Sequence, residues 1–480
     1  MIRLAALLFV LACTPKVAPA PLLAEAETAP GRELAGFVAF VQTVHPDPYR
    51  STSRDRFELV ARAAIAALDA DAQPSPTDVE RAWRSVLAEL HDAHAGIGFD
   101  PAVLDPQDFS VLPLGLRLTA DGAVVDRTLE DWPVGTVVTH IDGVSMDEIV
   151  ARLVPRTFSD GVGEEPRRAR ISAEFSRNYH AEFGLRPSYA IRALAPDGTV
   201  IEAELQGLTP IALRERRPPS RIGSILGDSP EPWPRLHALP DGTPVVRMPS
   251  FGVPDQEAYA ARVDAIFDQI GRPDALVLDL RGNPGGLRTH GMAVLDHLTP
   301  GPYAQWSRSR ARVGEIPAEW ADNVVFLYGS SEEALARYVP PRRQGWLEGD
   351  PLVSRADPVS EPLLDTKLVV VVDGITGSAA NELVLALKAV RPDAVLVGEE
   401  VGGGCERHVG EVPIAYRAGK TGVVAMLSLV EIEHVQVEDC EPGRGLIPEE
   451  RVTWTRDAMV AGTDPFLERA AAVVERLTGR

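Results

Sequence analysis

Residues 367–390 read KLVVVVDGITGSAANELVLALKAV, an apolar run, a polar turn and a second apolar run. The first run is short and continuously hydrophobic, which predicts a buried β-strand. The second run, from Ala379 to Val390, predicts a helix. Ser378 stands just before that helix, where it could be a helix N-cap or a nucleophile. Taken alone, the local sequence favours the N-cap, because serine is a preferred residue at that position.

The same alternation of apolar strands and helices surrounds this stretch. Continuous apolar strands alternating with helices predict an α/β fold with a largely parallel sheet that is covered on both faces. Ligands of such sheets bind at the carboxyl ends of the strands. The further predicted strands are 244–251, 275–280 and 394–398, and the predicted helices are 255–270 and 292–298.

The preceding parts of the chain have other periodicities. Residues 33–105 have apolar residues at helical spacing and predict an N-terminal helical region. Residues 106–208 have short apolar runs separated by Asp-Gly or Gly turns, which predict a compact β-rich module with one helix, Met146 to Leu153. Residues 209–241, rich in Pro and Arg, predict a linker, and 242–478 predict the α/β core.

The chain begins MIRLAALLFVLACTPK, with one arginine and an apolar run from Leu4 to Ala12. That run is too short to span a bilayer and predicts a secretion signal. Cys13 follows it directly, which indicates a bacterial lipobox over 1–13 and a Pro- and Ala-rich tether over 14–32. We therefore expect export to the bacterial cell envelope (periplasm) and a lipid anchor in a membrane. The alternative is an ordinary cleaved signal with an incidental cysteine.

The net charge of the chain argues against one class of partner, nucleic acid, and the cysteine count bears on disulfides. The 480 residues carry a net charge of -21, and the pI is about 5.0. Nucleic acid requires a basic surface, so the sequence predicts no nucleic-acid partner. With Cys13 lipidated, Cys405 and Cys440 remain as an even pair in an exported protein, which indicates a disulfide. Two buried free thiols are the alternative.

Three polar or glycine-bearing turns follow predicted strands, at 279–286, 377–381 and 398–404. The first reads Asp-Leu-Arg-Gly-Asn-Pro-Gly-Gly, in which consecutive glycines leave backbone N–H groups open to a substrate. In the second, Ser378 sits at the positive end of a helix beside the Ala379 N–H. These are the components of an oxyanion hole next to a nucleophile.

The motifs LVLDLRGNPGG (276–286), Ser-Ala-Ala-x-Glu (378–382) and Val-Gly-Glu with a glycine run (397–404) resemble the serine peptidases of family S41. These are the C-terminal processing and tricorn-type proteases, and the resemblance extends from about 33 to 452. It implies a crotonase/ClpP-like α/β core, and it implies that the β-rich module is PDZ-like and binds extended peptide segments. It implies neither a cofactor nor a metal.

Carried over by position, the resemblance makes Ser378 the nucleophile. It places the oxyanion hole at the Ala379 N–H and the N–H of Gly285 or Gly286. The C-terminal processing branch has a lysine in the glycine run, but this chain has glycine at 402–404. The sequence therefore resembles the tricorn-type branch more closely.

That branch takes its base from a histidine in a pattern resembling L-x-D-x-H. Residues 90–94 read LHDAH, so His94 matches the base. A glutamate near a late Gly-x-x-Pro turn completes the site in that branch. Glu441 is the candidate here, with Glu438 and Asp439 as alternatives.

Other side chains leave alternatives for the base and for a metal. His408 and His434 are the fallback bases, because they flank the glycine run and the acidic segment. His91, Asp92 and His94 could form a chance metal site, but their spacing is not a standard zinc pattern. We therefore expect no metal.

The sequence as a whole predicts an exported serine endopeptidase that cleaves unfolded or extended polypeptides. One alternative is a non-catalytic, peptide-binding lipoprotein on the same fold, because the expected lysine is missing. Another is a crotonase-type acyl-CoA enzyme, although coenzyme A is a cytoplasmic cofactor and the secretion signal argues against it. Residues 299–365 carry no motif, and the oligomeric state is not predicted.

Overall fold

The computed structural model describes residues 21–71, 73–216, 218, 220–227, 231–338, 345–349, 353–354 and 362–479. The predicted signal and Cys13 lie outside these residues. Within the described residues, no helix combines the length and the apolar character needed to cross a membrane.

The α/β prediction is confirmed by a six-stranded sheet in the order β20-β17-β16-β10-β9-β8. Neighbouring strands from β9 to β20 are parallel, and β8 is an antiparallel edge strand. The strands are β8 (Arg235–Ala238), β9 (Pro244–Arg247), β10 (Ala275–Asp279), β16 (Lys367–Val372), β17 (Val395–Gly398) and β20 (Glu450–Arg451).

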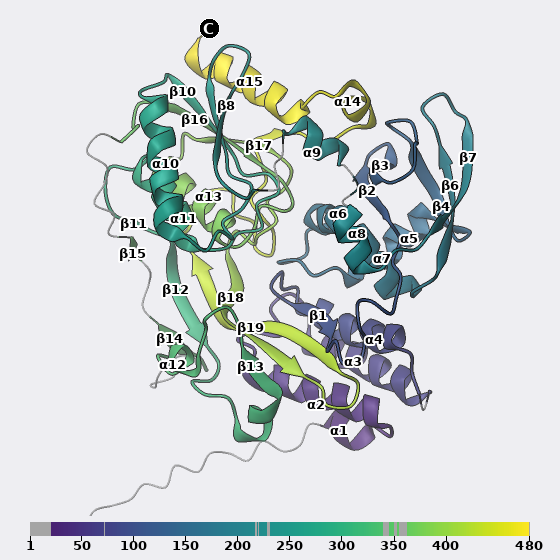
Figure 1. Ribbon diagram of the computed structural model, residues 1–480. Helices are drawn as coiled ribbons and strands as arrows, with labels where there is room; N and C mark the ends of the chain where they lie inside the picture. Colours follow the sequence, from purple (N-terminus) through teal and green to yellow (C-terminus); the bar gives the residue numbers. More distant parts are fainter. Residues whose placement is uncertain are drawn as a thin grey trace, which may run out of the picture.

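Both faces of this sheet are buried, which explains its continuous apolar strands. On β10, Leu276 and Leu278 belong to a core that also includes residues of the helices on one face. Ala275 and Val277 point the other way, into a core built on the last helix. Helices α10 (Gln256–Ile270), α11 (Arg288–Asp296) and α13 (Ala379–Val390) lie on one side, and α14 (Arg456–Ala461) and α15 (Pro465–Thr478) lie on the other (Figure 1).

A second six-stranded sheet, not predicted from the sequence, extends away from the first (Figure 1). Its path is β13-β18-β19-β12-β14, and β1 pairs with β19. Three of its six strands come from the segment 299–365, for which the sequence offered no motif. The strands are β1 (Gly96–Phe99), β12 (Trp306–Ala311), β13 (Val324–Phe326), β14 (Leu347–Gly349), β18 (Arg407–Arg417) and β19 (Val423–His434). Nearby lie the paired strands β11 (Tyr303–Ala304) and β15 (Val353–Ser354), with η2 (Ala318–Asn323) and α12 (Glu332–Leu335).

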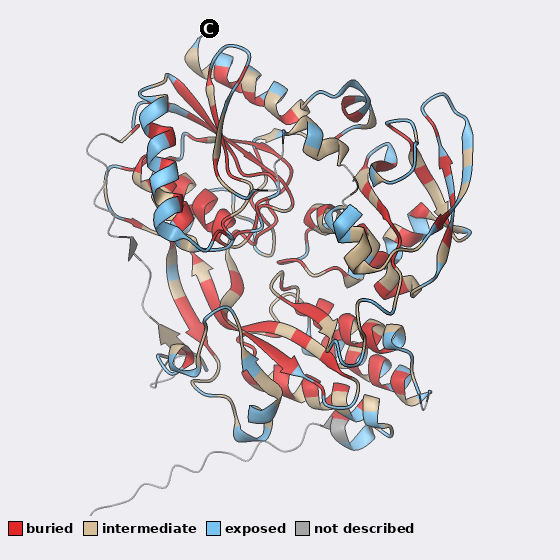
Figure 2. Cartoon of the chain, in the orientation of Figure 1, coloured by how far each residue is buried: buried red, intermediate tan, exposed pale blue. Residues whose placement is uncertain are grey.

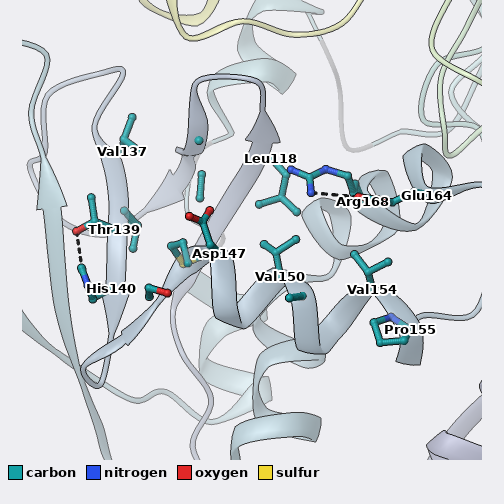
Figure 3. A pocket seen from close by; sticks show the side chains of 16 residues that line it. Leu118, Val137, Thr139, His140, Asp147, Val150, Val154, Pro155, Glu164 and Arg168 are labelled. Carbon is teal, nitrogen blue, oxygen red and sulfur yellow. Dashed lines mark hydrogen bonds and ion pairs between the residues drawn. The ribbon is translucent and has the colours of Figure 1, made fainter.

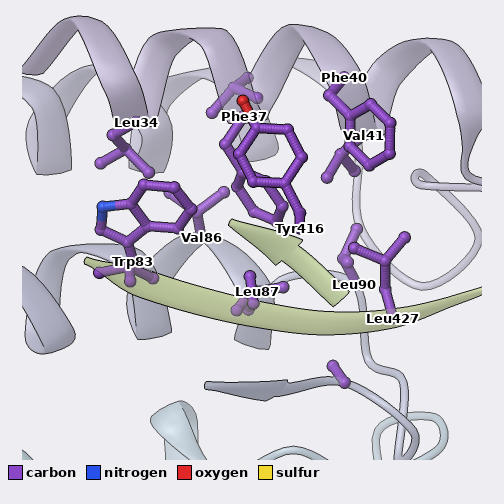
Figure 4. Packing of buried hydrophobic residues seen from close by; sticks show 14 of the residues in the cluster. Leu34, Phe37, Phe40, Val41, Trp83, Val86, Leu87, Leu90, Tyr416 and Leu427 are labelled. Carbon is purple, nitrogen blue, oxygen red and sulfur yellow. The ribbon is translucent and has the colours of Figure 1, made fainter. Parts of the chain in front are cut away.

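The N-terminal helices pack on this second sheet. The ring of Phe37 on α2 lies 4.7 Å from Trp83 on α4 and 5.1 Å from Tyr416 on β18, between ring centroids (Figure 4). The helical region therefore shares one hydrophobic core with strands near the C-terminus, and Figure 2 shows that contact as buried. The helices are α1 (Pro21–Glu25), α2 (Ala29–Val44), α3 (Arg54–Asp69) and α4 (Pro76–Ala88).

The β-rich module contains a sheet in the order β2-β3-β4-β6-β7, with β5 paired to β4. Its strands are β2 (Leu114–Thr119), β3 (Gly122–Thr128), β4 (Val137–Ile141), β5 (Val144–Ser145), β6 (Ser188–Leu194) and β7 (Val200–Gln206). Helix α5 (Met146–Leu153) has the predicted bounds, and Ser145 caps it by accepting the Glu148 N–H. Turn η1 (Val154–Arg156) follows α5 directly.

The expectation of one helix in this module is wrong, because α6 (Glu164–Ala173) and α7 (Phe175–Phe183) also occur. Helix α6 reads EEPRRARISA, so charged residues hide its narrow apolar face from a periodicity test. The predicted linker likewise contains two short helices, α8 (Pro210–Arg216) and α9 (Arg221–Ile225), and the edge strand β8.

Candidate active site

Ser378 occupies the turn between β16 and α13. Its φ of 49° lies in the left-handed region, which is rare for a residue with a side chain and is a kind of strain that clusters at functional sites. The side chain makes no cap hydrogen bond to α13. Instead its Oγ lies 3.2 Å from Nε2 of His94. The hydroxyl is therefore not a helix cap, and it is paired with a histidine 284 residues away in sequence.

His94 lies in the loop between α4 and β1. Its backbone N–H donates to Asp92 Oδ1 at 2.8 Å, and its Nδ1 lies 3.6 Å from the same oxygen. Burial lowers the pKa of His94, but the carboxylates of Asp92 and Asp160 outweigh burial and raise it. The His94 ring also stacks on His408, with centroids 5.1 Å apart.

Asp160 ties this loop to the rest of the molecule. It lies between η1 and α6 of the β-rich module and is 3% exposed. One carboxylate oxygen accepts the Ala93 N–H at 2.9 Å, and the other accepts the Gly404 N–H at 3.4 Å. Asp92 was visible in the LHDAH motif, although no role was predicted for it. Asp160 carried no signal in the sequence.

The glycine turn after β10 packs directly against the serine turn. Gly285 has a φ of 98°, and a Cβ there would lie 2.6 Å from Ser378 Cβ and 2.9 Å from the Ala379 nitrogen. The Gly285 N–H donates to Asn283 Oδ1 at 2.9 Å. Within the described residues, neither the Gly286 N–H nor the Ala379 N–H donates to a protein acceptor.

Arg281 and Asn283 hold this glycine turn in place. Arg281 Nη2 donates to Asp279 at 2.7 Å and to Asp464 at 2.9 Å, which joins β10 to the start of α15. Asn283 Nδ2 donates to the Met248 carbonyl at 3.0 Å. Burial raises the pKa of Asp279, but the guanidinium groups around it outweigh burial and hold it at about 2.

The two fallback bases lie behind His94 and not on the serine. His408 Nδ1 lies 3.0 Å from His434 Nε2, and both side chains are buried. Burial lowers the pKa of His434 to about 4 and lowers that of His408 well below its usual value. No described hydrogen bond joins either ring to Ser378.

The predicted disulfide is present, because Cys405 and Cys440 are bonded, with their Cα atoms 5.7 Å apart. It joins the glycine run to the acidic segment. Glu441, Glu438 and Asp439 on that segment are exposed. In the described part of the chain, no hydrogen bond or ion pair joins the Glu441 side chain to Ser378 or His94, so its role stays a prediction.

Two further features bear on the chemistry of the site, namely a lysine on α13 and a set of possible metal donors. Lys388 donates to the Ala394 carbonyl at 2.8 Å and to Glu449 at 2.7 Å, near the far end of α13 from Ser378. The described residues contain one set of three possible metal donors, namely Asp92, His94 and Asp160, whose donor atoms all lie within 4.8 Å of one another.

Part of the sequence matches a family model, and the structure resembles solved proteins in its fold. Residues 242–424 match the model of peptidase family S41. The crystal structure of mature CPAF has 17% sequence identity and a TM-score of 0.62, and the match covers 94% of this chain and 98% of that one. Mature CPAF complexed with lactacystin has 16% sequence identity and a TM-score of 0.62, and the match covers 94% of this chain and 99% of that one. A CPAF serine-to-alanine mutant has 15% identity and a TM-score of 0.64, with 94% and 98% covered. No curated protein matches the sequence.

Proposed function

Since the chain belongs to peptidase family S41 and is a serine-type peptidase, we propose that Ser378 is its nucleophile and His94 the general base. The observation that carries this proposal is the 3.2 Å separation of Ser378 Oγ and His94 Nε2. A base must lie within hydrogen-bonding distance of the proton that it removes, and this pair satisfies that condition without rearrangement.

The chemistry follows from the positions of the two ring nitrogens. With its proton on Nδ1, His94 presents a lone pair at Nε2 and takes the hydroxyl proton as Ser378 attacks a peptide carbonyl. The imidazolium that forms lies beside the Asp92 carboxylate, which stabilises its charge. His94 then gives the proton to the leaving amine, and water hydrolyses the acyl-enzyme by the same route.

Two backbone groups are suited to hold the oxyanion. Both the Ala379 N–H at the start of α13 and the Gly286 N–H are without a protein acceptor in the described residues. The Gly285 N–H is already used by Asn283, so Gly285 contributes the close approach of the two turns and not a donor. Donors fixed in this way stabilise charge as it develops in the transition state.

We propose unfolded or extended polypeptides as the substrates. The β-rich module supports this, because β4 and α5 border a groove of about 680 Å³ (Figure 3). Val137 and Val150 line it together with the polar side chains of Thr139 and Asp147. An extended segment can place apolar side chains on such a surface. The reaction calls for no cofactor.

We propose that the enzyme works outside the cytoplasm, in the cell envelope. The apolar N-terminal run and Cys13 support export and lipid anchoring. The Cys405–Cys440 disulfide supports an oxidising compartment.

Active-site labelling with a fluorophosphonate tests the nucleophile and the base together. We expect one adduct, mapped to Ser378 by mass spectrometry, which is lost in Ser378→Ala and in His94→Ala. The control variants Ser188→Ala and His237→Gln should label as the wild type does.

The outcomes separate the alternatives. Labelling that survives His94→Ala would move the base to another group. A folded protein that binds peptides but takes no label would support the non-catalytic binding lipoprotein instead.

A further inference from the structure

Several buried polar atoms without hydrogen-bond partners gather behind the catalytic histidine. They include Nε2 of His45, Oδ2 of Asp92 and Nδ1 of His94. His45 is 1% exposed and Asp92 is fully buried. Buried polar groups nearly always have a partner, so unsatisfied atoms at one place indicate a species that completes them.

The spacing of these atoms indicates what kind of species fits. His94 Nδ1 lies 3.6 Å from Asp92 Oδ1, and His45 Nε2 lies 3.8 Å from Asp92 Oδ2. Both separations are too long for a hydrogen bond. Ligands that bind zinc at about 2.0–2.2 Å in a tetrahedron lie about 3.4 Å from one another. The His94–Asp92 separation is within a few tenths of an ångström of that geometry, and the donor atoms of Asp92, His94 and Asp160 all lie within 4.8 Å of one another.

The charge at this place favours a cation over water. Asp92 and Asp160 are both buried, and their donor atoms lie within 4.8 Å of each other and of His94. The backbone N–H groups of Ala93, His94 and Gly404 donate to the two carboxylates. The Arg170 guanidinium is near enough to act on His94, but in the described residues it forms no ion pair with Asp92 or Asp160. Buried charges in proteins are normally paired or bound to a metal ion.

We propose that Asp92, His94 and Asp160 form a binding site for a zinc-type divalent cation that inhibits the peptidase. Imidazole and carboxylate ligands suit Zn²⁺ better than Mg²⁺, which prefers an all-oxygen octahedral shell. The existence of the site does not depend on the proposed function, whereas the inhibition rests on His94 being the base.

Inhibition follows from the tautomer of the ring. A metal ion on Nδ1 uses that lone pair, so the single proton of the neutral imidazole stays on Nε2. Nε2 then donates a hydrogen bond to Ser378 and cannot accept its proton. No bond is broken, so removing the cation restores the base.

Zinc binding is tested first without reference to activity. Ser378→Ala protein is dialysed to equilibrium against Zn²⁺ and its bound metal is counted. We expect one tightly bound zinc per chain, with affinity reduced at least tenfold when Asp160→Asn or Asp92→Asn is added. The exposed His237→Gln change on β8 is the matched control and should leave binding unchanged. Zinc that binds equally to all variants, or does not bind, would overturn the site and leave water as the missing partner.

The inhibitory role is tested on the wild type, which needs no variant to fold. Zn²⁺ should slow fluorophosphonate labelling of Ser378 at least tenfold, a chelator should restore it, and Mg²⁺ should have no effect. Zinc that binds without slowing the labelling would overturn the inhibition. A protein that takes no label even with chelator present would contradict the proposed function, while the dialysis result would still decide the metal site.

Discussion

Gly285 is the residue on which the geometry around Ser378 depends most closely. Its φ is 98°, and any Cβ at this position would lie closer to Ser378 Cβ and to the Ala379 nitrogen than side chains tolerate. The contact fixes the distance between the turn that carries Ser378 and the turn that carries Gly286. Glycine is needed here because two pieces of backbone meet, and not because the chain must be flexible.

We predict that Gly285→Ala slows labelling of Ser378 at least about 100-fold, because small displacements of reacting groups have effects of that size. The fold should be retained, as judged by circular dichroism. Gly301→Ala is the control, since a Cβ at Gly301 meets no atom within 4 Å. An alanine variant that labels at the wild-type rate would show that the two turns need not approach so closely.

The sequence predicted two residues of the candidate site but not all of the residues that position them. Ser378 and His94 were predicted because each lies in a short motif, and the structure brings them together. Asp160 could not be found, because its role comes from a contact between the β-rich module and the loop of His94. Glu441 was chosen by its distance from a later turn, and such an offset says nothing about where the side chain points.

At the level of helices and strands, the parallel sheet was the most predictable part. Helix α13 has the predicted bounds, and β10 and β16 lie within the predicted runs, because burial on both faces leaves a continuous apolar signal. Strands β18 and β19 were not predicted. Each carries polar residues among its buried ones, such as His408 on β18 and Glu431 on β19. The partner of Glu431, Arg50, lies 381 residues away in sequence.

The Cys405–Cys440 bridge joins the glycine run before β18 to the segment after β19. It closes a loop with a sequence separation of 35, and a loop of that size predicts a stabilisation of about 3–4 kcal/mol through the unfolded state. We predict that the double variant Cys405→Ala/Cys440→Ala loses about that much free energy of unfolding, measured by urea denaturation.

The matched comparison is the wild type with and without reductant, which should reproduce the loss without any change in side-chain volume. If the oxidised and reduced proteins unfold at the same urea concentration, the bridge would contribute nothing to stability.

At the scale of the whole molecule, one buried ionic network links the parallel sheet to the C-terminal helix. Asp279 ends β10, Arg281 begins the glycine turn, and Asp464 caps α15. Because Asp279 and Arg281 are buried, removing one of them leaves the other without its partner, which is costly.

The depressed pKa of Asp279 makes this network sensitive to acid. The pKa of the Asp279 carboxyl is about 2 in the folded chain, and its reference value is 3.8. The ionised carboxyl therefore stabilises the fold at pH values above 3.8. That stability is lost as the pH falls from about 4 to about 2. The difference corresponds to about 2 kcal/mol.

We predict that Asp279→Asn lowers the free energy of unfolding by at least about 2 kcal/mol at pH 7 and weakens its dependence on pH between 4 and 2. Urea denaturation at several pH values measures both effects. The exposed Asp268→Asn on α10 should change stability by less than about 0.5 kcal/mol. If the stability of the Asp279→Asn variant falls as steeply between pH 4 and pH 2 as that of the wild type, other carboxyls cause the fall.

The first helices share one hydrophobic core with a sheet near the C-terminus. This arrangement has a consequence for the synthesis of the chain. Phe37 and Trp83 leave the ribosome more than 300 residues before their partner Tyr416. His94 likewise precedes Ser378 by 284 residues, which at about 5–20 residues per second is roughly 15 to 60 seconds of translation. Throughout that interval the nascent chain has the proposed base but not the proposed nucleophile, together with an apolar helical surface that nothing yet covers. Proteolytic potential therefore arises only when the two ends of the polypeptide have met, so an unfinished chain cannot digest its neighbours.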